Sequence, residues 1–219
     1  MCGRFSLTAS GEEVAEAFGL DEAPALAPRY NIAPTQPVAV VRLEPPEAHR
    51  RLALVTWGLV PLGSLDGERG FINARAETAW EKPSFRDAFA RRRCLIPATG
   101  FYEWQRTEAR RRQPWHFRLR SGQSFAFAGL WEPGVADGQA ATCTILTTEP
   151  NDLARAVHDR MPVIVRPEDY ARWLDPAAGG VSALRALFAP FPAEAMAAYR
   201  VGTAVNDPRF EGPHCLEPA

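Results

Sequence analysis

Residues 115–130 read WHFRLRSGQSFAFAGL, and this stretch decides the expected class of fold. Residues 115–120 and 124–130 are rich in aromatic and aliphatic side chains, which is typical of short β-strands. Ser121 and Gly122 lie between the two segments, and this pair predicts a hairpin turn that joins them. We therefore expect a fold built around antiparallel strands.

Similar strand-like segments recur along the whole chain, between connections that contain most of the glycines and prolines. Shorter segments have a helical pattern, and Ser10 and Ser84 are predicted to cap two of them. Together they predict an α+β fold, a single domain over residues 1–219 around a curved, barrel-like, mainly antiparallel sheet with several short helices. The predicted strands are residues 3–8, 37–43, 51–57, 94–96, 101–105, 115–120, 124–130, 142–147, 162–165 and 200–205, and the predicted helices are residues 11–18, 84–91, 151–157, 167–174 and 182–187.

The composition favours a cytoplasmic protein. No apolar run approaches the ~20 residues that cross a bilayer, and no basic stretch followed by an apolar one begins the chain. The four cysteines form no CxxC pair, so we expect neither a metal nor another cofactor. The net charge of −1 gives no overall basic signal for nucleic acid. Two arginine runs, residues 91–93 and 110–112, are compatible with a solvated face or with phosphate contact.

The chain begins MCGRF, so loss of Met1 would make Cys2 the first residue. An α-amine has a pKa of ~7.7 to 8.0 and a cysteine thiol a pKa of about 8.5, so both groups can be activated near neutral pH. An amine and a thiol on adjacent carbons can close on an aldehyde to give a thiazolidine ring. The alternative is an incidental or buried cysteine.

Arg4 and the pair Asn73 and Arg75 are candidates to bind a sugar-phosphate ligand. Arg4, two residues after Cys2, has a planar fork that fits a phosphate or a carboxylate, although it can equally be a surface arginine. If residues 71–77 begin extended, Asn73 and Arg75 project on the same side of the chain. A helix start capped by Asn73 is an equally open interpretation.

Glu103 and Trp104 lie in the sequence GFYEW. A carboxylate in apolar surroundings tends to have a raised pKa, which suits general acid-base chemistry. Trp104 suits either the core or a platform on which a base stacks. In a regular strand the two side chains point to opposite faces, so one site can use both only if the strand bends, and Gly100 makes a bulge possible.

His158 and Arg160 lie in the sequence HDRMP. His158 is predicted near the end of a short helix that Pro162 stops. A helix C-terminus favours the imidazolium, so His158 is a candidate proton donor near neutral pH. A histidine that only caps the last carbonyls of the helix is the alternative.

Nine segments complete the pattern, and they occur in the order MCGRF, RYNIAPTQ, WGLVP, NARAET, RCLIPATGFYEW, FAGLWE, ILTTEPN, HDRMPVIV and AVNDPRFEGP. Together they resemble the SOS-response-associated peptidase (SRAP) family over nearly the whole chain. The resemblance implies a monomeric enzyme that removes its own Met1, senses abasic sites in single-stranded DNA and forms a thiazolidine crosslink through Cys2. Such a crosslinking or lyase-type activity would protect the lesion during the DNA damage response, with the protein at the nucleoid when bound to DNA and with no membrane partner.

The resemblance also implies roles for individual residues. Cys2 is the nucleophile, and Asn73 hydrogen-bonds near the amine and the opened sugar. Glu103 is the acid-base group for imine formation and Met1 removal, and His158 protonates the sugar oxygen as the ring opens and helps to reverse the link. The expected DNA-binding residues are Arg4, Arg75 and Arg160 on phosphates, Trp104 on a base, and Asn31, Pro34 and Thr35 along the pocket.

Two other function classes are compatible with parts of the sequence. A glutamine amidotransferase-type amidohydrolase with an N-terminal nucleophile can also begin MCG, but its oxyanion hole commonly uses an Asn-Gly pair. The four asparagines of this chain precede Ile, Ala, Asp and Asp, so no such pair exists. A non-catalytic single-strand-binding module is the other alternative, and the combination of Cys2, Asn73, Glu103 and His158 speaks against it.

Overall fold

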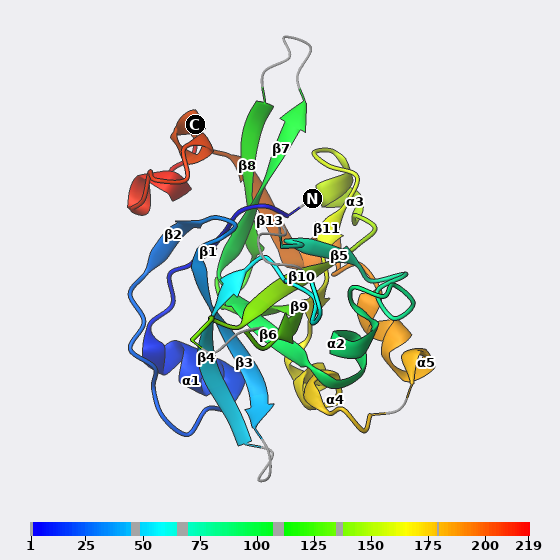
Figure 1. Cartoon of the computed structure of the whole chain (residues 1–219). Helices are drawn as coiled ribbons and strands as arrows, with labels where there is room; N and C mark the ends of the chain where they lie inside the picture. The colour runs from blue at the N-terminus through cyan, green and yellow to red at the C-terminus, as the bar shows by residue number, and fades with distance from the viewer. Residues whose placement is uncertain (1, 45–48, 65–69, 107–111, 135–137, 179) are drawn as a thin grey trace.

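The chain folds around two β-sheets that lie against each other (Figure 1). The computed structural model describes residues 2–44, 49–64, 70–106, 112–134, 138–178 and 180–219. Among these residues the first sheet has five strands, all paired antiparallel. In spatial order they are β13 (Met196–Arg200), β8 (Arg112–Leu119), β7 (Gly100–Arg106), β1 (Phe5–Leu7) and β2 (Arg29–Ile32).

The second sheet curves round on itself. Its pairings run from β10 through β4, β3, β6 and β9 and return to β10, but β3 and β6 are joined only at Val41 and Leu95. The sheet is therefore ring-like without being a fully closed barrel. Its described strands are β3 (Pro37–Glu44), β4 (His49–Trp57), β5 (Asn73–Arg75), β6 (Arg93–Ala98), β9 (Phe125–Glu132), β10 (Thr142–Thr148), β11 (Met161–Pro162) and β12 (Ile164–Val165).

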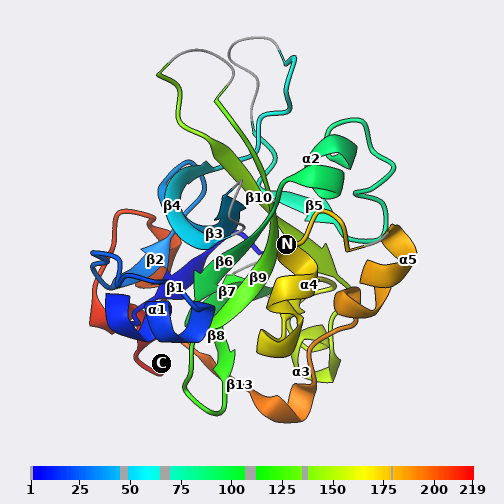
Figure 2. The same cartoon turned by 90° about the horizontal axis from the view of Figure 1, so that it is seen from below.

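Short helices flank the sheets on two sides, as two perpendicular views show (Figures 1 and 2). One side carries α1 (Gly11–Phe18), and the other carries α2 (Arg86–Arg91), α4 (Tyr170–Leu174) and α5 (Val181–Leu184). In the described part of the chain, no helix is both long enough and apolar enough to cross a bilayer. The remaining helical segments are α3 (Asp152–Arg155) and the 3₁₀ turns η1 (Pro167–Asp169), η2 (Arg185–Phe188), η3 (Ala193–Ala195), η4 (Thr203–Asn206) and η5 (Pro213–Leu216).

One cluster of buried apolar side chains extends across both sheets. Phe5 on β1 shows how the sheets meet, because its ring centroid lies 5.3 Å from that of Trp57 on β4 and 5.6 Å from that of Phe127 on β9. All three residues of β1 are buried. The predicted α+β fold with a curved, mainly antiparallel sheet is confirmed, and the N-terminal strand is part of its core.

The first predicted helix is confirmed at both ends. Ser10 and Glu13 form a capping box, in which the Ser10 side chain accepts from the Glu13 N–H and the Glu13 carboxylate accepts from the Ser10 N–H. Gly19 ends the helix with a φ of 64°. The predicted cap at Ser84 is wrong, since Phe85 takes the cap position of α2 and makes no side-chain cap hydrogen bond.

Two other predictions from the pattern are wrong. Ser121 and Gly122 do form a turn, but the strands on either side, β8 and β9, belong to different sheets and do not pair. Residues 115–130 therefore connect the two layers instead of forming a hairpin. The strand predicted over residues 200–205 ends at Arg200, and the chain continues into the 3₁₀ turn η4.

The C-terminal segment lies on the outer face of the five-stranded sheet, where Asn31 of β2 holds it. The fully buried Asn31 amide donates hydrogen bonds of 3.0 Å to the Asp207 carbonyl and 2.7 Å to the Phe210 carbonyl. Its Oδ1 accepts from Arg4 at 2.7 Å. Asn31 thus ties the first strand region to the last residues of the chain.

Replacing Asn31 with Ala is expected to destabilise the fold and release the C-terminal segment. Each neutral hydrogen bond lost to the Asp207 and Phe210 carbonyls is worth ~1 kcal/mol and the charge-assisted one from Arg4 ~1.5 kcal/mol, so the free energy of unfolding should fall by about 3 kcal/mol in urea titrations. Limited proteolysis after Phe210 should become faster. Ser10→Ala, expected to cost ~1 kcal/mol at a remote helix cap, is the control and should leave that cleavage unchanged. Equal cleavage rates in the parent and in Asn31→Ala would contradict this role.

Candidate active site

Cys2 is held inside the protein at the start of β1. Its side chain is fully buried, and its Sγ lies 4.0 Å from the Arg4 carbonyl oxygen. Burial raises the pKa of the Cys2 thiol well above its usual range, and the negative charge of Glu103 raises it further. Burial therefore opposes the ready activation of this thiol that its ordinary pKa predicts.

Asn73 fixes the backbone of Cys2. Its side-chain amide donates a 2.8 Å hydrogen bond to the Cys2 carbonyl, while its Oδ1 is buried and has no hydrogen-bond partner among the described residues. Asn73 begins β5, which pairs in parallel with β10. The extended interpretation of residues 71–77 is confirmed at this point, and a helix capped by Asn73 is excluded.

Glu103 is the buried carboxylate of the site. Its side chain is 4% exposed, and burial raises its pKa to about 7. The register of β7 against β8 is regular from Phe101 to Arg106, so there is no bulge at Gly100. Gly100 serves a different purpose, since a Cβ there would lie 2.2 Å from the His116 Nε2.

His158 follows the short helix α3 and faces Glu103. Its Nε2 lies 4.0 Å from the Glu103 Oε2, and its Nδ1 accepts a 3.0 Å hydrogen bond from the Arg160 backbone N–H. Partial burial lowers the pKa of His158, although the Asp159 carboxylate opposes this shift. The helix therefore gives the predicted imidazolium little support, because a four-residue helix has a weak dipole and the half-buried ring disfavours the charged form.

The two charge states of His158 use different partners. The neutral ring accepts from Arg160 at Nδ1 and therefore carries its proton on Nε2, toward Glu103. The Asp159 Oδ1 also lies 2.9 Å from Nδ1, and this contact becomes favourable when Nδ1 is protonated. His158 can thus gain a proton by exchanging one neighbour for another, without moving away from Glu103.

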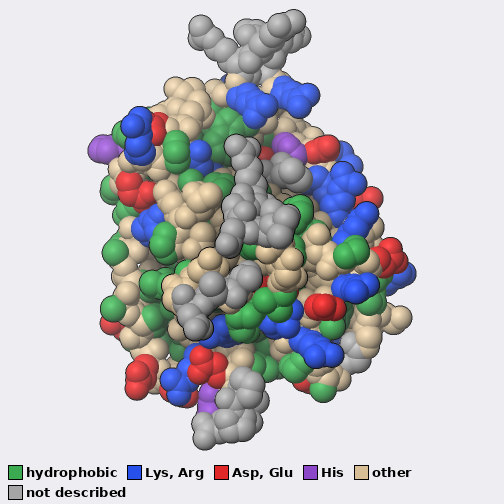
Figure 3. All heavy atoms as spheres, viewed as in Figure 1, with side chains coloured by type: hydrophobic (Ala, Val, Ile, Leu, Met, Phe, Trp, Pro, Cys, Tyr) green, Lys and Arg blue, Asp and Glu red, His purple; other side chains and the backbone are tan. Residues whose placement is uncertain are grey.

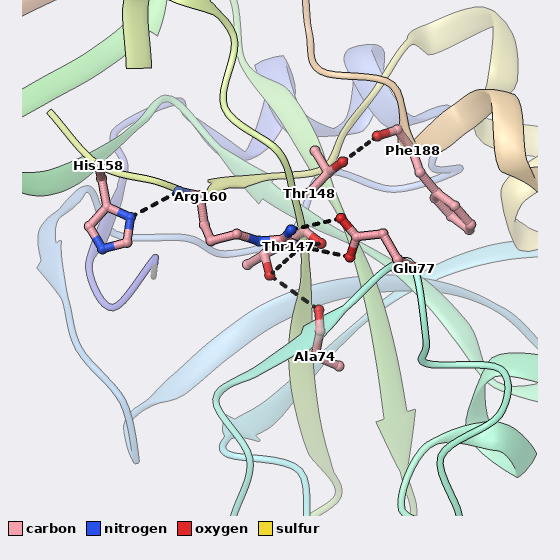
Figure 4. Close-up of polar contacts among 7 residues, drawn as sticks. All are labelled: Ala74, Glu77, Thr147, Thr148, His158, Arg160 and Phe188. Atoms are coloured by element: carbon pink, nitrogen blue, oxygen red, sulfur yellow. Dashed lines mark hydrogen bonds and ion pairs between the residues drawn. The ribbon is translucent and has the colours of Figure 1, made fainter. Parts of the chain in front are cut away.

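Glu77 and Arg160 brace the wall of the site (Figure 4). The Arg160 guanidinium makes a two-pronged contact with the Glu77 carboxylate at 2.7 and 2.8 Å and donates to the Thr147 carbonyl at 2.5 Å. The Thr147 hydroxyl donates in turn to the Ala74 carbonyl at 3.4 Å. Although partial burial acts to raise the pKa of Glu77, the Arg160 guanidinium lowers it overall. Glu77 stands in the NARAET segment, but sequence reasoning gave it no role because its partner is 83 residues away.

Arg4 and Trp104 lie together on the outer face of the five-stranded sheet. Arg4 donates to the Asn31 Oδ1 at 2.7 Å and to the Val205 carbonyl at 2.6 Å, and its guanidinium lies 5.7 Å from the centroid of the Trp104 ring. The Trp104 indole N–H donates to the Asn206 Oδ1 at 2.7 Å. Because β7 is regular, Trp104 and Glu103 face opposite sides of the sheet, so one pocket does not contain both.

The other predicted DNA-binding residues are less closely tied to Cys2. Pro34 and Thr35 form the turn between β2 and β3, where Thr35 has a φ of 70° and its N–H donates to the Trp57 carbonyl at 2.8 Å. Arg75 is exposed at the end of β5. Within the described residues, no group of three or more His, Cys, Asp or Glu side chains could hold a metal ion.

The two arginine runs have different environments. Arg93 is buried and donates to the Phe89 and Trp173 carbonyls, and Arg92 forms a 2.8 Å ion pair with the buried Glu132. Most of the first run therefore supports the fold. In the second run, Arg112 is exposed at the start of β8, whereas residues 110 and 111 lie outside the described residues.

Comparisons with known proteins identify the family of the chain. A family model described as SOS response associated peptidase (SRAP) matches residues 1–208. The chain is 40% identical to the abasic site processing protein YoqW of Bacillus subtilis, with 99% of each chain covered. It is 31% identical to the abasic site processing protein HMCES of Pongo abelii, covering 87% of this chain and 65% of that one. A crystal structure of a protein from Bacteroides thetaiotaomicron has a TM-score of 0.86 at 25% identity, with 100% of both chains covered.

The fold and the site define a protein in which the Asn73 amide holds a buried cysteine at position 2, the Glu103 carboxylate acts on its thiol, and the His158 imidazole lies beside that carboxylate. The matching family model and the similar proteins assign this protein to one family. The chain belongs to the SOS response associated peptidase (SRAP) family, as its order of motifs predicts.

The raised pKa of Glu103 predicts a pH-dependent cost in stability. A carboxyl with a pKa of about 7 in the fold, against 4.5 ordinarily, favours the folded state only while it is protonated. Relative to Glu103→Gln, the parent should lose up to about 3 kcal/mol of unfolding free energy between pH 4 and pH 8. Urea titrations at both pH values measure this difference, and a constant difference would contradict the assignment.

Glu77→Gln is expected to disturb the His158 ring indirectly, through Arg160, which contacts both residues. A neutral amide holds Arg160 less firmly, so the Arg160 N–H positions the His158 Nδ1 less well. Nitrogen-15 NMR of the imidazole should then show a smaller fraction of the Nε2–H tautomer than in the parent. Glu81→Gln, in the exposed turn after β5, is the matched control, and an equal change in both variants would rule out a specific role for Glu77.

Proposed function

We propose that this chain processes abasic sites in single-stranded DNA by joining Cys2 covalently to the aldehyde of the ring-opened sugar. The relatives that are named abasic site processing proteins support the substrate. The single observation on which the proposal depends is the fixed position of Cys2 beside Asn73 and Glu103. Its carbonyl is held by Asn73 at 2.8 Å, and its thiol lies within the electrostatic influence of Glu103.

Removal of Met1 comes first, because the amine of Cys2 exists only after the preceding peptide bond is hydrolysed. Water adds across that bond and methionine leaves. Glu103 is suited to take the proton of the attacking water and return it to the leaving amine, since a carboxyl with a pKa of about 7 exchanges protons readily at neutral pH. Met1 itself lies outside the described residues.

The amine of Cys2 then attacks the aldehyde carbon. A C–N bond forms, and the carbinolamine loses one water to become an imine. Protonated Glu103 donates the proton that the leaving hydroxyl requires, and the unpaired Asn73 Oδ1 accepts from the amine. His158 protonates the ring oxygen as the sugar opens, and its position with Nε2 4.0 Å from the Glu103 Oε2 supports this role.

The thiol closes the ring in the second step. Sγ adds to the imine carbon, and the thiol proton passes to the nitrogen, so the thiazolidine forms with a net loss of one water. Burial keeps the Cys2 thiol protonated, which supports this order of events: the amine reacts first and the thiol follows. The reverse path returns the aldehyde, and the same acid-base pair serves it.

The amidohydrolase alternative needs the thiolate as its first nucleophile. A buried thiol with a raised pKa does not favour that chemistry. The amidohydrolase alternative predicts release of ammonia from glutamine, which a coupled assay measures directly. Ammonia release that depends on Cys2, without any DNA adduct, would favour the alternative over our proposal.

Mixing the protein with single-stranded DNA that contains one abasic site is expected to give an adduct that survives a denaturing gel. Cys2→Ala should give no stable adduct, because its amine forms only a hydrolysable imine. Cys2→Ser should behave likewise unless borohydride reduces and traps that imine. Glu103→Gln should slow adduct formation by at least ~100-fold, in the range usual for loss of a general acid-base group.

Cys215→Ala is the matched control, since Cys215 is also buried but lies in the C-terminal segment. It should form the adduct at the parental rate. Intact mass must first establish that Met1 is absent from each sample. A stable adduct of equal yield in Cys2→Ala would overturn the thiazolidine proposal.

A further inference from the structure

The proposed reaction requires positive charge along the DNA strand, and two of the expected arginines are already engaged within the fold. Each nucleotide brings a phosphate, and protein contacts to phosphates are normally made by Lys and Arg. Arg4 holds the Asn31 side chain and the Val205 carbonyl, and Arg160 holds Glu77 and Thr147. Of the three, only Arg75 is exposed, so further cations are needed near Cys2.

A groove on the outer face of the five-stranded sheet leads from the reactive residue to other arginines. It is lined by Gly3, Arg4, Trp104, Arg112 and Asn206. Gly3 is the residue after Cys2, so the groove begins next to the nucleophile. Arg112 stands at the outer end of β8, where β7 and β8 project beyond the body of the protein (Figure 1).

Arg106 lies directly across from Arg112 in the β7–β8 pairing. Both are exposed, and Arg106 shares a face of β7 with Trp104, because alternate residues of a strand point the same way. Figure 3 shows Lys and Arg side chains gathered over this end of the two strands. Partial burial is the main cause of the lowered pKa of His158, but the positive charge of Arg106 also contributes, so Arg106 lies within electrostatic range of the site.

Two like charges directly opposite each other destabilise a strand pair unless something neutralises them. Among the described residues, neither Arg106 nor Arg112 forms an ion pair with an acidic side chain. A phosphate anion between the two guanidinium groups would satisfy both, since each group offers a planar fork of donors.

We propose that Arg106 and Arg112 form a phosphate-binding pair that holds the backbone of the single strand flanking the abasic nucleotide. This inference rests on the proposed function and adds a second contact region to it. The strand would pass from Cys2 along the groove beside Trp104 and reach the arginine pair about 7 Å further along β7. The pair contributes binding and register, while the bond-forming chemistry stays at Cys2.

The test compares Arg106→Gln/Arg112→Gln with the parent in binding a single-stranded oligonucleotide that contains an unreactive tetrahydrofuran abasic analogue. Fluorescence anisotropy between 50 and 200 mM salt gives the slope of log K against log salt. Loss of two phosphate contacts should reduce that slope by about 1.4, at ~0.7 per contact on a single strand. Affinity at low salt should fall roughly tenfold or more.

Arg118→Gln is the matched control, because Arg118 is exposed on the same face of β8, roughly 20 Å from Arg112. It should leave the slope unchanged. An unchanged slope in the double variant, or an equal loss in Arg118→Gln, would overturn the inference. Adduct yield with a saturating abasic oligonucleotide should match the parent in Arg118→Gln, and absence of adduct in the parent would instead refute the proposed function.

Discussion

The antiparallel pairing of β1 with β7 is the constraint on which the site depends. Chain ends are usually poorly ordered unless an element ties them down. Here the second residue precedes a strand that lies inside a five-stranded sheet and packs through Phe5 on Trp57 and Phe127 of the other sheet. Asn73 then fixes the Cys2 backbone from the second sheet. Cys2 therefore has a defined position relative to Glu103, which a residue in a frayed end could not have.

Burial gives the site its chemical character. It disfavours the charged form of each group, which is the thiolate of Cys2, the carboxylate of Glu103 and the imidazolium of His158. The pKa values of Cys2 and Glu103 therefore rise and that of His158 falls. Condensation of an amine with an aldehyde requires proton transfer in both directions. A group whose pKa lies near the working pH performs such transfers well, and Glu103, with a pKa of about 7, is such a group. The outer face of the sheet, with Trp104 and the exposed arginines, supplies the contrasting charged surface.

Local sequence patterns predicted where helices, strands and turns lie better than which of them contact each other. The sequence around Ser10 predicted α1 to the residue, because a capping box and a helical period act within a few positions. Ser121 and Gly122 predicted a turn correctly but a hairpin wrongly, since strand composition does not say which strands pair. The same limit explains the site: the motifs identified Glu103 and Asn73, but the Glu77–Arg160 brace joins residues too far apart to be seen in one segment. Asn31 and Arg4 are predicted from the sequence only as DNA-binding residues, and their contacts with the C-terminal segment join residues too far apart in the chain to be predicted.

The chain offers a direct way to locate its nucleophile, because Lys82 is its only lysine. Once Met1 is removed, as we propose, an abasic aldehyde can therefore meet only two primary amines of the chain, the α-amine of Cys2 and the side chain of Lys82. Tryptic digestion of the adduct followed by mass spectrometry distinguishes them. Our account predicts the sugar on the peptide Cys2-Gly3-Arg4, with the thiol blocked to alkylation and the link resistant to borohydride. A sugar on Lys82, or a Cys2 thiol that remains free in the adduct, would contradict it.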